Sequence, residues 1–174
     1  MKHASPLLVL ALSSLLAGAA MAAPPQTSGV IDRNGFRLLN TDRSVAFGEA
    51  QADVVAHVSR VFGGAPVLTH EDNCRNGAFD TADWGKGLKL IFQGGKLVGW
   101  NADRTLPAGY VNRAGTIFGR PVSAIGAENP GFMLSDAAPR GRAFVLDGVN
   151  GLVLAPGQSA TIDVLWAGAS CRKR

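Results

Sequence analysis

The segment that decides the fold is LKLIFQGGKLVGW, residues 88–100. In an extended strand, side chains two positions apart point to the same side, so Leu88, Leu90 and Phe92 share one apolar face. Gly94-Gly95 supplies the positive φ angles that a two-residue hairpin turn requires. The segment therefore predicts an antiparallel hairpin, which we interpret as part of a larger antiparallel sheet.

The residues before this hairpin predict a helix that begins near Glu49. Apolar residues recur at helical spacing as far as Phe62, and the carboxylates of Glu49 and Asp53 suit the positive end of a helix dipole. Gly63-Gly64 then ends the helix. We interpret residues 70–87, between the helix and the hairpin, as an acidic loop.

A shorter hairpin is predicted upstream of the helix. Asn34-Gly35 is a strong two-residue turn signal, and it lies between the apolar runs Val30-Ile31 and 36–39. We therefore expect a short hairpin or an extended arm at the start of the folded domain.

The second half of the chain repeats this order more loosely. Pro121 suits the first position of a short helix, which Gly126 ends. Strand-like runs follow at 143–146, 152–154 and 161–166. In the last run, alternation predicts that Ile162, Val164 and Trp166 share the covered face of the strand, which places Trp166 in the core.

These elements predict an α+β fold, with short helices packed on one face of an antiparallel sheet. Each half consists of a helical segment followed by antiparallel strands, so 36–103 and 104–171 are interpreted as two degenerate repeats. Residues 23–174 have the length of one compact domain, and we expect a single one.

Residues 1–22 are interpreted as a cleavable signal peptide. Lys2 precedes an apolar run over 7–16, and small residues follow that run. The run is too short to span a bilayer, which takes about 20 apolar residues. We therefore expect cleavage before Ala23, a periplasmic or secreted bacterial protein, and no transmembrane segment.

The charge distribution argues against nucleic-acid binding. The chain has 17 basic and 13 acidic residues, but Lys2 belongs to the signal peptide and Arg172, Lys173 and Arg174 form a basic tail. The remaining body is therefore neutral, and it has no basic stripe interleaved with aromatic residues. The tail is interpreted either as a solvated end or as a weak contact for an anionic surface.

The two cysteines, Cys74 and Cys171, are expected to pair, because an exported protein meets an oxidising compartment. Such a disulfide closes a loop of nearly a hundred residues. In the loop-entropy model this stabilises the fold by about 4 to 5 kcal/mol. It also requires the two halves of the chain to lie side by side.

Several motifs resemble a known module. They are Phe47-Gly48-Glu49, Phe62-Gly63-Gly64-Ala65-Pro66 and LIFQGGKLVGW over 90–100. The resemblance is to the helix-then-hairpin unit of SmpA/OmlA-type outer-membrane assembly lipoproteins, which the beta-lactamase inhibitory protein uses in tandem. With residues 165–168 and Cys171, the chain is also similar to exported bacterial proteins of unassigned function. The resemblance implies a non-catalytic, protein-binding role.

Catalytic and metal-binding signals are sparse. Asp53 lies four positions before His57 on the predicted helix, and a carboxylate in that position orients an imidazole base or forms an exposed polar stripe. His70-Glu71 begins like a zinc-protease signature, but Cys74 stands where the second histidine belongs. We therefore predict no metal and no cofactor.

Two tryptophans remain open between core and surface roles. Trp84 lies in the predicted acidic loop with Asp80 and Asp83, where an aromatic ring either covers the core or anchors a partner. Trp100 ends a strand, and either role is open to it. We take Trp84, Asp80, Asp83 and Trp100 as candidate binding residues.

The leading hypothesis is an exported, non-enzymatic domain that binds a protein or a cell-envelope component. Its predicted surface is the 70–87 segment with the sheet face beside it. The alternative is a small periplasmic hydrolase that uses His57 with Asp53, or His70 with Glu71. A third hypothesis is a structural envelope protein whose basic tail contacts anionic lipid.

Overall fold

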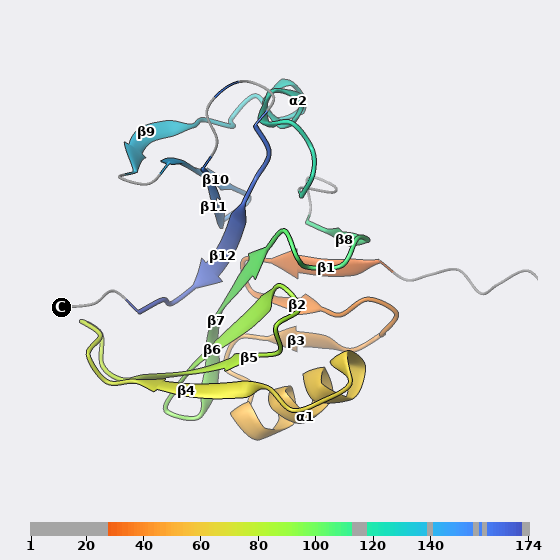
Figure 1. Ribbon diagram of the computed structural model, residues 1–174, viewed down its shortest axis with the longest axis vertical. Coiled ribbons are helices and arrows are strands. Elements are labelled where there is room, and N and C mark those ends of the chain that lie inside the picture. Colours follow the sequence, from red (N-terminus) through yellow and green to blue (C-terminus); the bar gives the residue numbers. More distant parts are fainter. Residues whose placement is uncertain (1–27, 113–117, 139–140, 155–156, 158–159, 172–174) are drawn as a thin grey trace, which may run out of the picture.

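The computed structural model describes residues 28–112, 118–138, 141–154, 157 and 160–171 (Figure 1). The predicted signal peptide, 1–22, and the basic tail, 172–174, lie outside these residues. Within the described ranges, neither helix has the length and apolar content needed to cross a membrane.

The largest element is an eight-stranded antiparallel sheet, called the large sheet below. Its strand order is β4-β5-β6-β7-β12-β11-β10-β9, so the last strands of the two halves pair at its centre. The strands are β4 (Val67–Glu71), β5 (Phe79–Asp83), β6 (Leu88–Gln93), β7 (Lys96–Asp103), β9 (Ser135–Ala138), β10 (Gly141–Leu146), β11 (Val149–Val153) and β12 (Val164–Gly168).

A four-stranded small sheet and two helices complete the fold. The small sheet has the order β3-β2-β1-β8, with β1 and β8 parallel. Its strands are β1 (Gly29–Asp32), β2 (Gly35–Arg37), β3 (Ser44–Ala46) and β8 (Tyr110–Val111), and the helices are α1 (Gln51–Phe62) and α2 (Val122–Glu128). The fold is therefore α+β, as predicted, and it is dominated by sheet.

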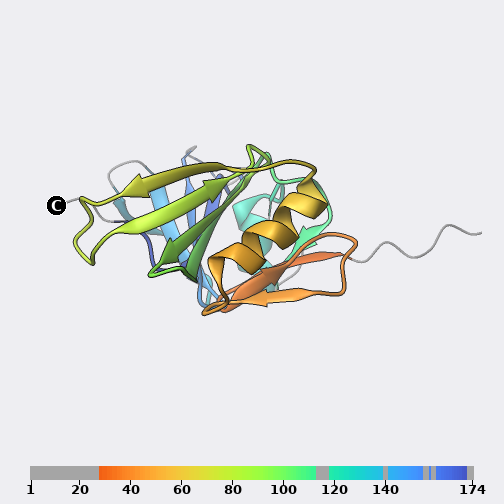
Figure 2. The ribbon, with the colours of Figure 1, turned by 90° about the horizontal axis from the view of Figure 1, so that it is seen from below.

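The helices and the small sheet lie on the same side of the large sheet. In Figure 1, α1, the small sheet and α2 lie to the right of the strands that run from β4 to β9, and Figure 2 shows α1 between the small sheet and strands β4–β6. Buried residues of all these elements form one apolar cluster, to which Ile31, Val54, Leu90 and Ile125 belong. This side of the large sheet is therefore its covered face.

The hairpin predicted over residues 88–100 is confirmed. β6 and β7 pair antiparallel, with Gln93 opposite Lys96 and Gly94-Gly95 between them. Both glycines have positive φ, 57° and 72°. Leu88, Leu90 and Phe92 are all buried on the covered face.

The upstream hairpin forms with a different turn from the predicted one. Asp32 pairs with Gly35, so Arg33 and Asn34 are the two turn residues, and Gly35 already belongs to β2. Gly35 cannot be replaced without strain, because a Cβ there would lie 2.0 Å from the carbonyl oxygen of Val45. The Asn34-Gly35 signal therefore reflects close strand packing as well as a turn.

The interpretation of residues 70–87 as a loop is wrong, because this segment contains the last two residues of β4 and the whole of β5. Every residue of β4 from Val67 to His70 is exposed, so the strand lacks the alternation of apolar and polar residues that identifies a strand. In β5, Phe79 and Ala82 are the two buried residues, and their odd spacing hides the pattern.

The predicted orientation of the last strand is also wrong. Leu165 and Ala167 are buried on the covered face, whereas Val164 and Trp166 are half-buried on the other side. Ile162 and Asp163 are adjacent and both buried, so the backbone before β12 does not alternate. β12 begins only at Val164, and its alternation is therefore shifted by one residue from the predicted one.

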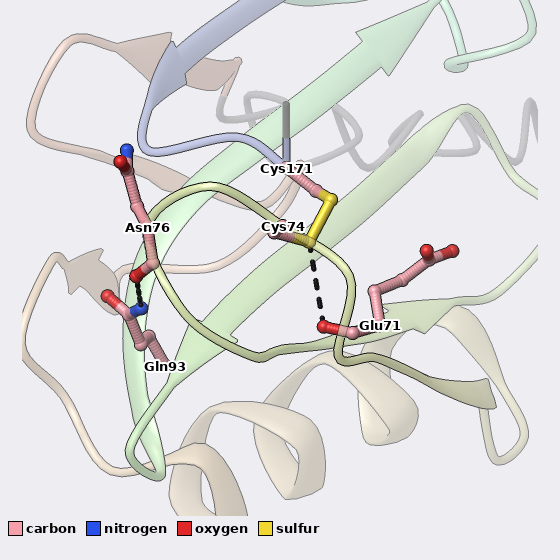
Figure 3. Close-up of a disulfide and its surroundings, with 5 residues drawn as sticks. All are labelled: Glu71, Cys74, Asn76, Gln93 and Cys171. Carbon is pink, nitrogen blue, oxygen red and sulfur yellow. Dashed lines mark hydrogen bonds between the residues drawn. A yellow bond between two sulfur atoms is a disulfide. The ribbon is translucent and has the colours of Figure 1, made fainter. Parts of the chain in front are cut away.

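The predicted disulfide is present. Cys74 and Cys171 are bonded, with their Cα atoms 5.1 Å apart and 97 positions between them in the sequence. Figure 3 shows the bond joining the segment between β4 and β5 to the segment after β12. Beside it, the Gln93 side chain donates a hydrogen bond of 2.7 Å to the Asn76 carbonyl oxygen, which fixes the same segment to β6.

Removing the disulfide tests how much it stabilises the fold. We expect the double variant Cys74→Ala, Cys171→Ala to lose about 4 kcal/mol of unfolding free energy, because a long loop is no longer closed in the unfolded chain. Urea denaturation followed by circular dichroism measures this loss. Wild-type protein in a reductant is the matched control, and it should unfold with the variant. Equal stability of the oxidised protein and the variant would contradict the expectation.

Candidate functional site

The side of the large sheet opposite α1 and the small sheet is called the open face. Strand pairing aligns seven of its residues in one line across seven strands. These residues, the transverse row, are Val67, Asp83, Lys89, Asn101, Trp166, Asn150 and Val145. All seven are exposed or half-buried. The adjacent line on the covered face contains Ala82, Leu90, Trp100 and Ala167, which are all buried.

A second line of open-face residues runs beside the transverse row. It consists of Asp103, Val164, Leu152, Ala143 and Ser135, again paired from strand to strand. These residues are also exposed or half-buried. The open face thus presents a continuous surface from β4 to β10.

Three hollows lie along this surface. The first, about 340 Å³, is bounded by Met133, Val145, Asn150 and Trp166 among others. The second, about 270 Å³, lies between Lys89 and Val164 at the centre of the sheet. The third, about 290 Å³, lies over β4–β7 and is bounded on one side by Ser170 and Cys171.

The two ends of the open face differ in polarity. On the β5–β7 side the Asp83 carboxylate pairs with the Lys89 ammonium at 3.1 Å, and both side chains are about two-fifths exposed. On the β10–β12 side, the exposed or half-buried residues are mostly apolar, with Val145 58% and Met133 79% exposed. The surface therefore combines a charged area with an apolar one around Trp166.

The segment after β12 covers one part of the open face. The Ala169 N–H donates a hydrogen bond of 2.8 Å to the Val98 carbonyl oxygen, and a Cβ on Gly99 would lie 2.3 Å from the Ala169 carbonyl oxygen. Phe79 and Ile91 are buried beneath this segment together with Cys74. Without it, two large apolar side chains would be added to the open face.

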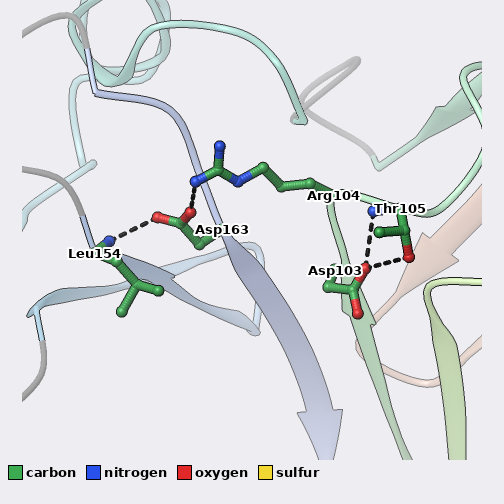
Figure 4. A network of polar contacts seen from close by, with 5 residues as sticks. All are labelled: Asp103, Arg104, Thr105, Leu154 and Asp163. Atoms are coloured by element: carbon green, nitrogen blue, oxygen red, sulfur yellow. Dashed lines mark hydrogen bonds and ion pairs between the residues drawn. The ribbon is translucent and has the colours of Figure 1, made fainter.

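An ion pair between the exposed Arg104 side chain and the buried Asp163 carboxylate joins two parts of the sheet near the central hollow. The Arg104 guanidinium donates to the Asp163 carboxylate, which is 5% exposed and also accepts a 2.6 Å hydrogen bond from the Leu154 N–H. Figure 4 shows these contacts beside Asp103, whose carboxylate accepts two hydrogen bonds from Thr105. Because the Asp163 carboxylate is paired on both oxygens, we assign it a structural role.

The four candidate binding residues do not form one site. Asp83 lies in the transverse row, but Asp80 lies at the other side of β5, where it contacts the His70 imidazole at 2.7 Å. The Trp84 ring packs edge-on against Phe62, and its N–H donates to Ser59 and Gly64 of α1 and the turn after it. Trp84 therefore covers the end of α1.

Trp100 is removed from the candidate surface by its burial. Its side chain is fully buried, and its indole N–H donates a 2.9 Å hydrogen bond to the Asp32 carbonyl oxygen. A side chain in this position cannot contact a partner. It joins the large sheet to β1 of the small sheet instead.

The residues that sequence reasoning missed are Lys89, Asn101, Asn150 and Trp166. The first three are polar residues inside apolar strands, which is the one signal in the sequence that could have indicated an open face. Their alignment depends on strand order and register, which local patterns do not determine.

The two candidate histidines occupy different environments. His57 lies on the buried side of α1 and is 5% exposed, whereas Asp53 is exposed. The Nε2 atom of His57 has no hydrogen-bond partner among the described residues. The expectation of an exposed stripe at His57 is therefore wrong. His70 is exposed and bonded to Asp80, and this hydrogen bond raises the pKa of its imidazole.

Burial lowers the pKa of His57 below 6.5, and the positive charges of Arg43 and Arg60 lower it further, against the opposing effect of Glu49.

Among the described residues, no group of three or more side chains of the metal-ligating types is found. Comparison with known protein families, curated proteins and solved structures finds no match to this chain.

The buried imidazole predicts how stability depends on pH. The folded state disfavours the protonated form of His57. The contribution of this residue to the free energy of unfolding is therefore full above pH 6.5, and it is lost as the pH falls through the lowered pKa. We expect His57→Leu to flatten the decline in urea stability between about pH 7 and pH 5. The variant should also gain about 1 kcal/mol of unfolding free energy at neutral pH, because a buried nitrogen without a hydrogen-bond partner is removed.

His70→Gln is the matched control for this measurement. Because the pKa of His70 is raised, the contribution of His70 to the free energy of unfolding is full below pH 6.5. It is lost as the pH rises through the raised pKa. The control should therefore keep the acid decline that the His57 variant loses. An unchanged acid decline in His57→Leu would contradict the assignment of this decline to His57.

Proposed function

We propose that this chain is an exported domain that binds another protein through the open face of its large sheet. The observation that carries the proposal is the transverse row, in which Trp166 lies between Asn101 and Asn150 at the middle of the sheet. Protein interfaces characteristically combine a central aromatic residue with a polar rim. In the row, the polar residues Asn101 and Asn150 flank Trp166 on its two sides.

The apolar part of the open face supports binding over simple solvation. An antiparallel sheet with one face in water usually presents polar side chains there. Here Val145, Leu152 and Val164 lie on the same face as Trp166. Met133 borders the hollow beside Trp166. A contiguous apolar surface of this kind is typical of interaction sites.

The charged part of the open face suits selectivity. The Asp83–Lys89 ion pair is solvent-exposed, so it contributes little to the stability of the fold. Charges at the rim of an interface mainly affect the rate of association and the choice of partner. We therefore assign affinity to the area around Trp166 and selectivity to the area around Lys89.

Neither His57 nor His70 shows the carboxylate pair that the hydrolase alternative assigned to it. The His57 imidazole is buried and Asp53 is exposed, and the His70 ring nitrogen is bonded to Asp80 rather than to Glu71. The hydrolase alternative needs an accessible base beside a nucleophile. The binding proposal needs only the exposed surface described above.

The proposed partner surface is tested by capture from a periplasmic extract, with the oxidised protein as bait. We expect Trp166→Ala to weaken capture of the enriched protein about thirtyfold, because a central aromatic residue of an interface contributes about 2 kcal/mol. Val145→Asp should act in the same direction, because it places a charge in the apolar area. Binding of the captured protein is then quantified by calorimetry.

Arg43→Ala is the matched control variant. Arg43 forms an exposed ion pair with Glu49, next to β3 and α1, away from the open face. This variant should capture the same protein as the wild type. Thermal denaturation must show that all variants are folded. If both open-face variants bind the captured protein as tightly as the Arg43 variant, the open face is not the binding surface.

A further inference from the structure

The middle of the edge strand β4 carries none of the features by which sheets avoid pairing with other chains, although Pro66 precedes the strand and Glu71 ends it. Val67 is 70% exposed and Leu68 is 60% exposed, and Thr69 beside them is exposed too. These three residues contain no charge, proline or glycine, and their pairing with β5 is regular. Natural edge strands usually avoid such a combination, because an exposed apolar edge is a template for another strand.

The chemistry of an edge defines what pairs with it. β4 is the terminal strand of the large sheet, and beyond it no further strand is present in the described part of the chain. The side of β4 away from β5 presents backbone N–H and C=O groups at the spacing of a β-ladder. An extended strand is the structure that satisfies these groups, as in recognition by strand addition.

We propose that the strand which pairs with β4 is β4 of a second copy of this chain, in an antiparallel arrangement centred on Leu68. A two-fold axis through Leu68 places Leu68 opposite Leu68 of the second copy, and Val67 opposite Thr69 of that copy. The contact is therefore isologous, with the same residues on both copies, as a symmetric dimer requires. The proposal does not depend on the proposed function.

This register also separates like charges. Glu71 lies three residues from the axis, so it is six residues from Glu71 of the second copy, a distance of about 20 Å along the ladder. That distance exceeds the range of screened charges at physiological salt. His70 is two residues from the axis, and its imidazole is bonded to the Asp80 carboxylate of its own chain.

The arrangement joins the two open faces. An axis that pairs two edges antiparallel is perpendicular to the sheet, so both open faces point to the same side. Val67 is the terminal residue of the transverse row, and pairing at β4 places it opposite Thr69 of the second copy, on the same face of the joined sheet. The dimer would thus present one surface of twice the width.

The dimer is expected to be weak, because pairing of one short strand buries less than the about 1,200 Å² of a stable interface. Sedimentation velocity of protein purified after expression of the full-length chain tests it. We expect a monomer that becomes a dimer as the concentration rises through about 10–100 μM. Leu68→Lys should stay monomeric over this range, because it places two like charges at the axis.

Thr81→Lys is the matched control. Thr81 pairs with Thr69 from within the sheet, so this variant adds the same charge to the neighbouring strand without altering the edge. It should dimerise like the wild type. A wild type that stays monomeric throughout the range, or a Leu68→Lys variant that associates like the wild type, would overturn the proposal.

A second variant does not depend on the tolerance of the fold for a lysine. Leu68→Cys places two thiols across the axis, where opposite Cα atoms lie about 4.5–5.5 Å apart. Mild oxidation should convert this variant into a covalent dimer, seen on a non-reducing gel, whereas Thr81→Cys should remain monomeric. Equal cross-linking of both variants, or of neither, would also overturn the proposal.

Discussion

The antiparallel pairing of β7 with β12 is the constraint on which the rest of the structure depends. It joins the four strands that follow α1 to the four that precede the end of the chain, and makes one large sheet of them. Covalent and ionic contacts support both ends of this pair. The Cys74–Cys171 disulfide lies beyond one end, and the Arg104–Asp163 pair lies at the other. The transverse row crosses the sheet through this junction, at Asn101 and Trp166.

The parts of the fold that were predicted are those that local chemistry determines. The β6–β7 hairpin follows from Gly94-Gly95 and from alternating apolar residues, and α1 follows from apolar residues at helical spacing. The disulfide follows from having two cysteines and an expected oxidising compartment. β4 was not predicted, because its residues are exposed on both faces and hence carry no period. β5 was missed because its core residue on the covered face is only Ala82.

The candidate surface was beyond prediction for a different reason. Whether Trp166 faces the core or the open face depends on one irregular step at Ile162-Asp163, where two adjacent side chains are both buried. A shift of one residue exchanges the two faces of a strand. Lys89 and Asn150 are far apart in the sequence and fall into one row only through strand order. A surface whose residues are brought together by strand register, rather than by a sequence motif, cannot be recognised from local sequence patterns.

The position of the segment after β12 has a practical consequence for anyone who attaches this protein to a bead, a chip or a dye. Cys171 is held on the side of the open face, whereas Gly29 begins a strand on the opposite, covered side. A linker joined downstream of Cys171 therefore starts beside the proposed binding surface. Immobilisation from the upstream end leaves that surface directed toward the solution.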